Sequence, residues 1–360
     1  MSPQADGRGS KSTAEAERGT LGTRPRPRAS TEASAMQPSD LSGARVGVVI
    51  PAYRVAQQIE TVVRGIPPWV ASIIVVEDAS PDDTAERVER LRDPRVKLLR
   101  HERNQGVGGA MATGFAEAIR QGLDVVVKMD GDDQMDPEHL PALLEPLLQH
   151  RADVAKGNRY ASAAHVQQMP AIRLLGNAGL TFLVKLASGY WSNFDPANGY
   201  LALRTEVLES LDLPRLPKRY YFESGLLVEL GILRAVVVDV PLHARYGDEI
   251  SSLSVPKTLL EFPPRLVKGL ARRLFWRYLV HDFTAVSVFM LLGVPMLLFG
   301  VLYGAWSWWS FSARGEYAPL GVVMLAVMPI ILGMQLVLQA IVLDIQGVPR
   351  VPISPPLRRS

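Results

Sequence analysis

The sequence predicts an α/β domain with a mostly parallel sheet, followed by a hairpin of two transmembrane helices. Short apolar runs of strand length alternate with helical patterns from Arg45 onward. Acidic and aromatic residues directly follow several of these runs, where the strands are expected to end. Near the C-terminus, 283–313 and 317–343 contain no charged residue, and each exceeds the roughly 20 residues that a helix needs to cross a bilayer.

The bulk composition excludes some classes of function. The chain has 360 residues, no cysteine and a formal net charge of +3. Disulfides, thiolate chemistry and cysteine-ligated zinc are therefore excluded. No nucleic-acid partner is expected, because nucleic-acid binders usually carry a denser basic face. Residues 1–44 are rich in Ser, Ala, Gly, Pro and Arg, which predicts a disordered tail, and they contain no apolar run typical of a secretory signal.

The elements of the domain follow from the apolar pattern. Strands are expected at 46–50, 72–76, 96–99, 124–129, 154–155 and 236–240. Helices are expected at 56–66, 84–91, 107–121 and 137–149, with Gly122 ending the third. Alternating strands and helices imply right-handed crossovers, and ligands of such sheets bind outside the carboxyl ends of the strands.

The C-terminal part is expected to be a membrane anchor. Residues 282–345 would form two transmembrane helices, although two buried helices of a soluble core are the alternative. Basic residues lie on both flanks: Arg265, Lys268, Arg272, Arg273 and Arg277 before the first span, and Arg350, Arg358 and Arg359 after the second. The positive-inside rule therefore predicts a multi-pass membrane protein whose domain faces the cytoplasm, with 346–360 as a cytoplasmic tail.

Two segments mix bases with large apolar residues. Residues 256–281 carry Leu, Phe, Trp and Tyr among Arg and Lys, which predicts an amphipathic helix lying on anionic lipid. Residues 170–191 are a second candidate of this kind, and a core helix of the soluble domain is the equal alternative.

Two carboxylates at the end of a predicted strand indicate a metal site. Asp130 and Asp132 follow the run 125–128, separated by Gly131, which lets another group approach the backbone closely. Magnesium is commonly held by one or two carboxylates together with substrate phosphates, and Gln134 can add an amide oxygen. A solvated acidic turn is the alternative reading, and the position after a strand favours the metal.

Other polar residues follow strands in the same way. Asp78 can accept a hydrogen bond from a nucleobase, whereas Ser80, Asp82 and Asp83 are explained as helix caps. Arg159 and Arg245 suit diphosphate oxygens, because a guanidinium binds them in a bidentate way; a surface salt bridge is the alternative for either. Asp195 and Glu223 are isolated acids among aromatic residues, suited to a base role or to turn and helix caps. Residues 106–110 open a helix and indicate close packing rather than a dinucleotide site.

Taken together, these residues resemble glycosyltransferase family 2, and within it the dolichol- and polyprenyl-phosphate glycosyltransferases, over about residues 45–255. Five motifs occur in the family's order. They are Pro51-Ala52-Tyr53, Val76-Glu77-Asp78-Ala79-Ser80-Pro81-Asp82, Asp130-Gly131-Asp132-Asp133-Gln134, Gly157-Asn158-Arg159-Tyr160, and Arg245-Tyr246-Gly247 with Ser251-Ser252.

The resemblance implies a GT-A fold, inversion at the anomeric carbon and a divalent metal, Mg²⁺ or Mn²⁺. By position, the base and ribose would be held by Pro51, Ala52, Tyr53, Val76 and Asp78. Metal and sugar diphosphate would be held by Asp130, Gly131 and Asp132, with Gln134 assisting. Arg159 and Arg245 would neutralise phosphates, and Asp195 would lie near the acceptor, which makes Asp132, Arg159 and Asp195 the expected catalytic residues.

The sequence departs from the family at three places. Arg54 and Val55 replace Asn and Glu, Glu77 replaces an Asp, and Leu253 stands where a Lys that would touch a phosphate is expected. No Q-x-x-R-W motif is present, which argues against a processive polysaccharide synthase.

The expected function is transfer of a sugar from GDP-mannose or a UDP-hexose to a polyprenyl phosphate. Two alternatives stay open: a family 2 enzyme acting on a lipid or glycan hydroxyl, and a non-catalytic membrane subunit that binds a nucleotide sugar.

Overall fold

The computed structural model describes residues 43–161, 171–242 and 255–357, and within them seven strands form one sheet. The order across the sheet is β3-β2-β1-β4-β6-β5-β7. The strands are β1 (Val46–Ala52), β2 (Ser72–Glu77), β3 (Val96–Arg100), β4 (Val125–Lys128), β5 (Val154–Asn158), β6 (Leu201–Arg204) and β7 (Val237–Pro241). All six expected strands are present, and the α/β prediction is confirmed. Most of the predicted tail at 1–44, together with Arg245, Arg358 and Arg359, lies outside the described residues.

The sheet contains one strand that the sequence does not predict. β6 lies between β4 and β5 and runs antiparallel to both, with Leu201 opposite Lys128 on one side and Lys156 on the other. The remaining pairings are parallel. The sheet is therefore mostly parallel, as expected, and it carries an antiparallel strand in its second half.

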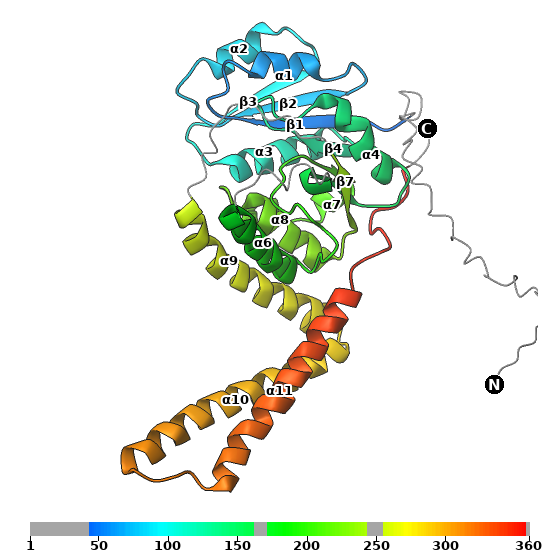
Figure 1. Ribbon diagram of the computed structural model, residues 1–360. Helices are drawn as coiled ribbons and strands as arrows, with labels where there is room; N and C mark the ends of the chain where they lie inside the picture. The colour runs from blue at the N-terminus through cyan, green and yellow to red at the C-terminus, as the bar shows by residue number, and fades with distance from the viewer. Residues whose placement is uncertain (1–42, 162–170, 243–254, 358–360) are drawn as a thin grey trace, which may run out of the picture. The chain divides into compact units, whose positions relative to one another are not determined.

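Helices cover both faces of the sheet (Figure 1). One face packs against α1 (Ile59–Gly65), α2 (Thr84–Arg90) and α4 (Leu140–Leu148), which continues a short 3₁₀ turn at Pro137–His139. The other packs against α3 (Val107–Arg120), α6 (Ala171–Ser188), α7 (Thr205–Glu209), α8 (Phe222–Leu233) and α9 (Val255–Phe275). Further 3₁₀ turns lie at Arg159–Ala161 and Leu213–Arg215. Strand residues alternate between two apolar clusters, as expected for a sheet buried on both faces.

The start of α3 lies directly against the segment 217–219. A Cβ added to Gly108 would stand 1.8 Å from the carbonyl oxygen of Pro217, and one added to Gly106 would stand 2.5 Å from that of Lys218. Gly106 also has a φ of +81°, which glycine adopts without steric cost. The interpretation of these glycines as a close-packing turn is thus confirmed, and Gly122, with a φ of +65°, follows the end of α3 as expected.

The segment predicted to lie on lipid is the long helix α9, followed by a π-helical segment at Trp276–His281. One face of α9 packs on the domain through Phe262 and Leu266, which are buried. Val267 and Phe275 are more than half exposed. In α6, Val184 is buried and Phe182 is exposed, so the domain covers only part of this helix.

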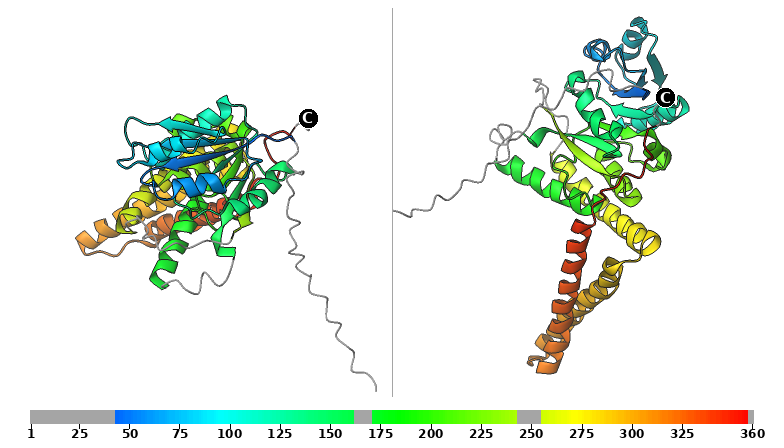
Figure 2. Two further views of the ribbon diagram at one scale, coloured as in Figure 1. Left: turned by 90° about the horizontal axis from the view of Figure 1, so that it is seen from above. Right: turned by 90° about the vertical axis from the view of Figure 1, so that its right-hand side faces the viewer.

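The two predicted spans are helices α10 (Ala285–Arg314) and α11 (Leu320–Gln346), which run side by side (Figures 1 and 2). Each is long and apolar enough to cross a membrane, and most of their side chains face away from the protein. Glycines let the two backbones meet. A Cβ on Gly293 would lie 3.1 Å from the carbonyl oxygen of Gly333, and one on Gly300 would lie 2.7 Å from that of Ala326. Such close contact is typical of helix pairs in membranes.

A buried ion pair joins the hairpin to the domain. Arg273 of α9 has an exposed fraction of 0%, and its Nη1 and Nη2 lie 2.8 and 3.0 Å from the two carboxylate oxygens of Asp344 near the end of α11. Arg273 also donates to the carbonyl oxygens of Leu186 and Ala187 at the end of α6. Tyr278 donates its hydroxyl to Asp344. Arg273 is therefore a structural ion, although the sequence counts it among the lipid-facing charges.

The segment after α11 returns to the domain. Asp153, fully buried just before β5, accepts hydrogen bonds from the backbone N–H groups of Ile353 (3.0 Å) and Ser354 (2.9 Å) and from the Ser354 hydroxyl (2.5 Å). Arg204 donates to the carbonyl oxygen of Pro355 at 2.9 Å. Residues 353–355, predicted to be part of a cytoplasmic tail, are held against the sheet.

Candidate active site

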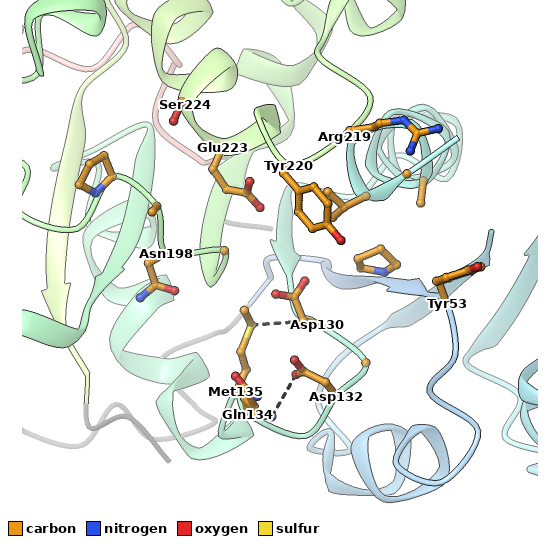
Figure 3. Close-up of a pocket in the computed structure, with 18 of the residues that line it drawn as sticks. Tyr53, Asp130, Asp132, Gln134, Met135, Asn198, Arg219, Tyr220, Glu223 and Ser224 are labelled. Carbon is orange, nitrogen blue, oxygen red and sulfur yellow. Dashed lines mark hydrogen bonds between the residues drawn. The ribbon is translucent and has the colours of Figure 1, made fainter. Parts of the chain in front are cut away.

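A cavity of about 720 Å³ lies at the carboxyl ends of β1, β2 and β4, where the sequence predicts the ligand. The loops that follow these strands form one wall, and the segments 195–199 and 219–224 form another. Leu180, Thr181 and Val184 of α6 and Phe262 of α9 add a third, largely apolar wall. Figure 3 shows Tyr53, Asp130, Asp132, Tyr220 and Glu223 around this space.

The loops at the cavity are tied together and partly strained. Arg54, Ala79 and Asp133, one after each of β1, β2 and β4, have φ angles of +57°, +54° and +63°. Non-glycine residues in this region cost energy and persist where the surroundings fix them. Ser80 provides one such restraint, because its hydroxyl accepts a hydrogen bond from the Arg54 N–H at 2.7 Å and donates to Asp82 at 2.6 Å.

The residues predicted to hold the base divide into two groups. Pro51, Ala52 and Tyr53 all line the cavity, and the Tyr53 side chain is 42% exposed. Val76 is fully buried in the apolar cluster beneath the sheet and is not among the lining residues. Its side chain therefore packs in the core beneath β1 and β2 and does not face the cavity.

Asp78 lines the cavity and also holds the loop that precedes α3. Its Oδ1 accepts from the Gln105 N–H at 2.8 Å and lies 2.7 Å from His101 Nδ1, and its Oδ2 accepts from the Gly106 N–H at 2.7 Å. Asp78 is 2% exposed. Both carboxylate oxygens thus have partners within the chain, so any contact with a base adds to a structural role.

The predicted metal ligands line the same cavity. Asp130, Gly131, Asp132 and Gln134 all belong to the loop after β4. The loop is held by the Asp130 N–H, which donates to the Met135 sulfur at 3.2 Å, and by the Gln134 N–H, which donates to Asp132 Oδ1 at 3.2 Å (Figure 3). The figure shows the Asp130 carboxylate directed toward Glu223 and Tyr220.

This set of oxygen donors fits Mg²⁺ or Mn²⁺ held jointly with a substrate. Within the described ranges, no cluster of three His, Cys, Asp or Glu side chains that could enclose a metal occurs. A hard cation bound through one or two carboxylates takes its remaining ligands from phosphate and water. Asp130 and Asp132 could therefore supply carboxylate ligands to such a cation, and Gln134 an amide oxygen.

Lys128 lies beneath Asp130. Its Nζ is 2.6 Å from Asp130 Oδ1 and 3.5 Å from Glu223 Oε1, and its side chain is 1% exposed. Burial alone would lower the pKa of Lys128, but attraction to these two carboxylates outweighs it and raises that pKa above its ordinary value. A Cβ on Gly199 would lie 2.5 Å from this Nζ and 2.9 Å from Asp130 Oδ2, so a larger residue there would displace one or both groups.

Arg159 and Asp195, both predicted to be catalytic, form an ion pair at the cavity. Arg159 Nε lies 2.8 Å from Asp195 Oδ2 and Nη2 lies 3.1 Å from Oδ1. Asp195 is buried, and both residues line the cavity. Lys156 donates to the Asn198 carbonyl oxygen; burial lowers its pKa to about 8, although attraction to Asp195 and Glu223 opposes the shift.

The cavity also includes residues that the sequence did not single out. Among them are Asn104, Asn198, Arg219, Tyr220, Ser224 and the apolar residues of α6 and α9. Arg219 and Tyr220 directly precede α8, and no recognisable sequence motif marks this position. Arg219 and Tyr220 are brought to the site by the contact of Gly106 and Gly108 with 217–219. This contact depends on tertiary packing.

Comparison with known proteins gives consistent results. A model of glycosyl transferase family 2 matches residues 47–212. Polyprenol monophosphomannose synthase of Mycolicibacterium smegmatis is 34% identical over 212 residues, which cover 55% of this chain and 76% of that protein. The UDP-N-acetylglucosamine–dolichyl-phosphate N-acetylglucosaminyltransferase of Methanococcus voltae is 28% identical over 216 residues, or 56% of this chain and 86% of that protein.

A solved structure shares the fold. Glucosyl-3-phosphoglycerate synthase of Mycobacterium tuberculosis, in complex with uridine diphosphate, aligns with a TM-score of 0.50 and 22% sequence identity, covering 66% of this chain and 82% of that one. The same synthase has been solved with Mn²⁺ and uridine diphosphate, with a TM-score of 0.49.

Proposed function

The chain belongs to glycosyl transferase family 2, and on that premise we propose that it transfers a sugar from a nucleotide sugar to a polyprenyl phosphate. The observation that carries the proposal is one cavity with two kinds of wall. Asp130 and Asp132 lie at the strand ends, and the apolar side chains of α6 and α9 lie opposite. α9 leads through the π-helical segment into the two apolar helices. By name, one relative of this chain transfers N-acetylglucosamine to dolichyl phosphate and another is a polyprenol monophosphomannose synthase.

The donor would lie along the strand ends. Pro51, Ala52 and Tyr53 would contact the base and ribose, with Asp78 holding the adjacent loop in place. Asp130 and Asp132, with Gln134, would hold Mg²⁺ or Mn²⁺. When bound, such a cation stabilises the negative charge that develops on a diphosphate leaving group.

Positive side chains would support the same leaving group. Arg159 lines the cavity, and its bonds to Asp195 fix the direction of its guanidinium before the donor arrives. Preorganised charge of this kind stabilises a transition state without reorganising as the reaction proceeds. Arg245, outside the described residues, is proposed for a similar role from its motif alone.

A phosphate acceptor needs little help to react. One of its oxygens would attack the anomeric carbon, the bond from that carbon to the diphosphate oxygen would break, and its electrons would leave with the nucleoside diphosphate, inverting the configuration. The acceptor is already an anion, so Asp195 would not need to act as a base and would serve to orient Arg159. For a hydroxyl acceptor, a general base is required. Asp195 is paired and 1% exposed, so that role would fall to Glu223.

The membrane arrangement is part of the proposal. α10 and α11 would cross the bilayer, and the exposed face of α9 would lie on its surface. Arg273 and Arg277 are buried, so among the described residues an orientation with the domain in the cytoplasm depends on Arg265, Lys268, Arg272 and Arg350. Arg358 and Arg359, outside the described residues, add to this flank by sequence alone.

Radiolabelled GDP- and UDP-sugars, offered with undecaprenyl and shorter polyprenyl phosphates and Mn²⁺ or Mg²⁺, test this function. We expect one donor to give an acid-labile lipid product whose formation is abolished by EDTA. Metal-dependent donor binding without a lipid product would contradict the phosphate acceptor and favour a hydroxyl acceptor. Donor binding without transfer to any acceptor, whether a phosphate or a hydroxyl, would favour a non-catalytic subunit.

Gly199 offers a test of the site's geometry. In Gly199→Ala the new methyl group would meet Lys128 Nζ and Asp130 Oδ2, so we expect sugar transfer to fall at least about tenfold with the fold retained. Gly179→Ala in α6, where the added carbon has nothing within 4 Å, is the matched control and should retain wild-type transfer. Equal activity of the two variants would show that this contact does not position Asp130.

A further inference from the structure

Lys128 occupies a position of the sheet that its neighbours fill with apolar side chains. Val126, two residues earlier on β4, belongs to the apolar cluster on the α8 side of the sheet, and Lys128 faces the same way. Opposite Leu201 it has a counterpart, Lys156 of β5, at the same level across β6. Both lysine side chains are fully buried. Burial of an ammonium group is unfavourable unless it is paired, so the partners of each lysine indicate its role.

The partners of the two lysines differ. Lys156 donates to the backbone oxygen of Asn198. Lys128 binds one oxygen of Asp130 at 2.6 Å and reaches toward Glu223 at 3.5 Å. Gly199 packs closely against both groups, because a Cβ there would lie 2.5 Å from Lys128 Nζ and 2.9 Å from Asp130 Oδ2. One oxygen of Asp130 is thus bound to a resident ammonium group, while Asp130 itself lines the cavity.

We propose that Lys128 is a resident counter-ion that weakens divalent-cation binding to the free site, so that the cation binds tightly only together with the donor diphosphate. The inference rests on the proposed function and concerns the metal site within it. Lys128 neutralises part of the charge of Asp130 and Glu223. The negative charge that remains attracts a divalent cation weakly. The donor diphosphate supplies the additional negative charge that tight cation binding needs.

The size of the effect follows from Coulomb's law. An ammonium group bonded to a metal ligand lies within several ångströms of the cation, in a site walled by protein. At the effective dielectric constants of such sites, removing one unit charge at that distance strengthens cation binding by about tenfold or more. Lys156 bonds to the backbone carbonyl of Asn198, whereas Lys128 bonds to Asp130 itself, so removal of Lys156 should change cation affinity much less.

Manganese titrations followed by electron paramagnetic resonance test the proposal on the full-length protein in detergent. Free Mn²⁺ is measured with wild type, Lys128→Met and Lys156→Met, each with and without whichever of UDP or GDP binds wild type. Without nucleotide, we expect Lys128→Met to bind Mn²⁺ at least about tenfold more tightly than wild type. With nucleotide, the difference should shrink. Lys156→Met should match wild type in both titrations.

A charge-balanced double variant keeps the test decisive if Lys128→Met folds poorly. Lys128→Met/Glu223→Gln removes one positive and one negative charge, so its Mn²⁺ affinity without nucleotide should return to within about threefold of wild type. Unchanged or weaker Mn²⁺ binding by folded Lys128→Met would overturn the proposal, and so would an equal change in Lys156→Met. If wild type itself binds no Mn²⁺ even with nucleotide, the proposed metal site fails instead, which is a distinct result.

Discussion

Asp132→Asn is expected to lower sugar transfer by about a hundredfold to a thousandfold while leaving the protein folded. The substitution removes the charge that would hold the cation. It keeps the oxygen that accepts the Gln134 N–H at 3.2 Å, so the loop after β4 should retain its shape. Initial rates of transfer at saturating donor and acceptor, with Mn²⁺ varied over a wide range, measure the loss.

Asp133→Asn is the matched control for this prediction. Asp133 belongs to the same loop, is exposed and is not among the cavity-lining residues. Its φ of +63° suits asparagine, which adopts the left-handed region more readily than most residues. We expect nearly wild-type rates. Normal turnover by Asp132→Asn would indicate metal-independent chemistry and would refute the mechanism proposed above.

The largest expected effect on stability concerns Asp344→Asn. The substitution leaves Arg273, with an exposed fraction of 0%, without the charge that compensates it. Removing one partner of a buried ion pair typically costs about 3–5 kcal/mol. We therefore expect a marked fall in the melting temperature of the detergent-purified protein. We also expect faster proteolysis at the π-helical segment, because Tyr278 donates to the same carboxylate.

Two further variants separate this pair from a general effect of charge. Glu316→Gln, at the exposed turn of the hairpin, breaks a contact of 3.7 Å with Arg314 and should melt as wild type does. Arg273→Met/Asp344→Leu removes both buried charges and should be more stable than Asp344→Asn, since apolar replacement of a whole pair is often neutral. A double variant as unstable as the single one would show that packing, and not charge, holds the joint.

The sequence was sufficient for the parts of the fold that local pattern determines. The strands at Val46, Ser72 and Val125 are continuous apolar runs, as a sheet covered on both faces requires, and Asp130 and Asp132 follow such a run directly. Their convergence with Tyr53 follows from the rule that ligands of α/β sheets bind at the carboxyl ends of strands.

Tertiary contacts determine what the sequence could not predict. β6 has four residues and ends at Arg204, whose side chain is buried through bonds to Glu206 and Pro355, so its apolar run of three residues is too short to predict a strand. Arg273 is read from sequence as a flanking charge, and only the fold brings Asp344 to it. Lys128 and Glu223 are far apart in the chain, and their contact depends on α8 lying on the same face of the sheet as the Lys128 side chain.

The bonds between Asp153 and residues 353–354 determine when this part of the fold can be completed during synthesis of the chain. Asp153 is made 200 residues before Ile353. Until then its carboxylate has one backbone partner at the start of β7, the Val236 N–H, and the bonds from Ile353 and Ser354 are still missing. Both apolar helices are translated in the interval. The bonds that satisfy the buried carboxylate of Asp153 are therefore completed only after both apolar helices have been synthesised, and a chain released before that point would lack them.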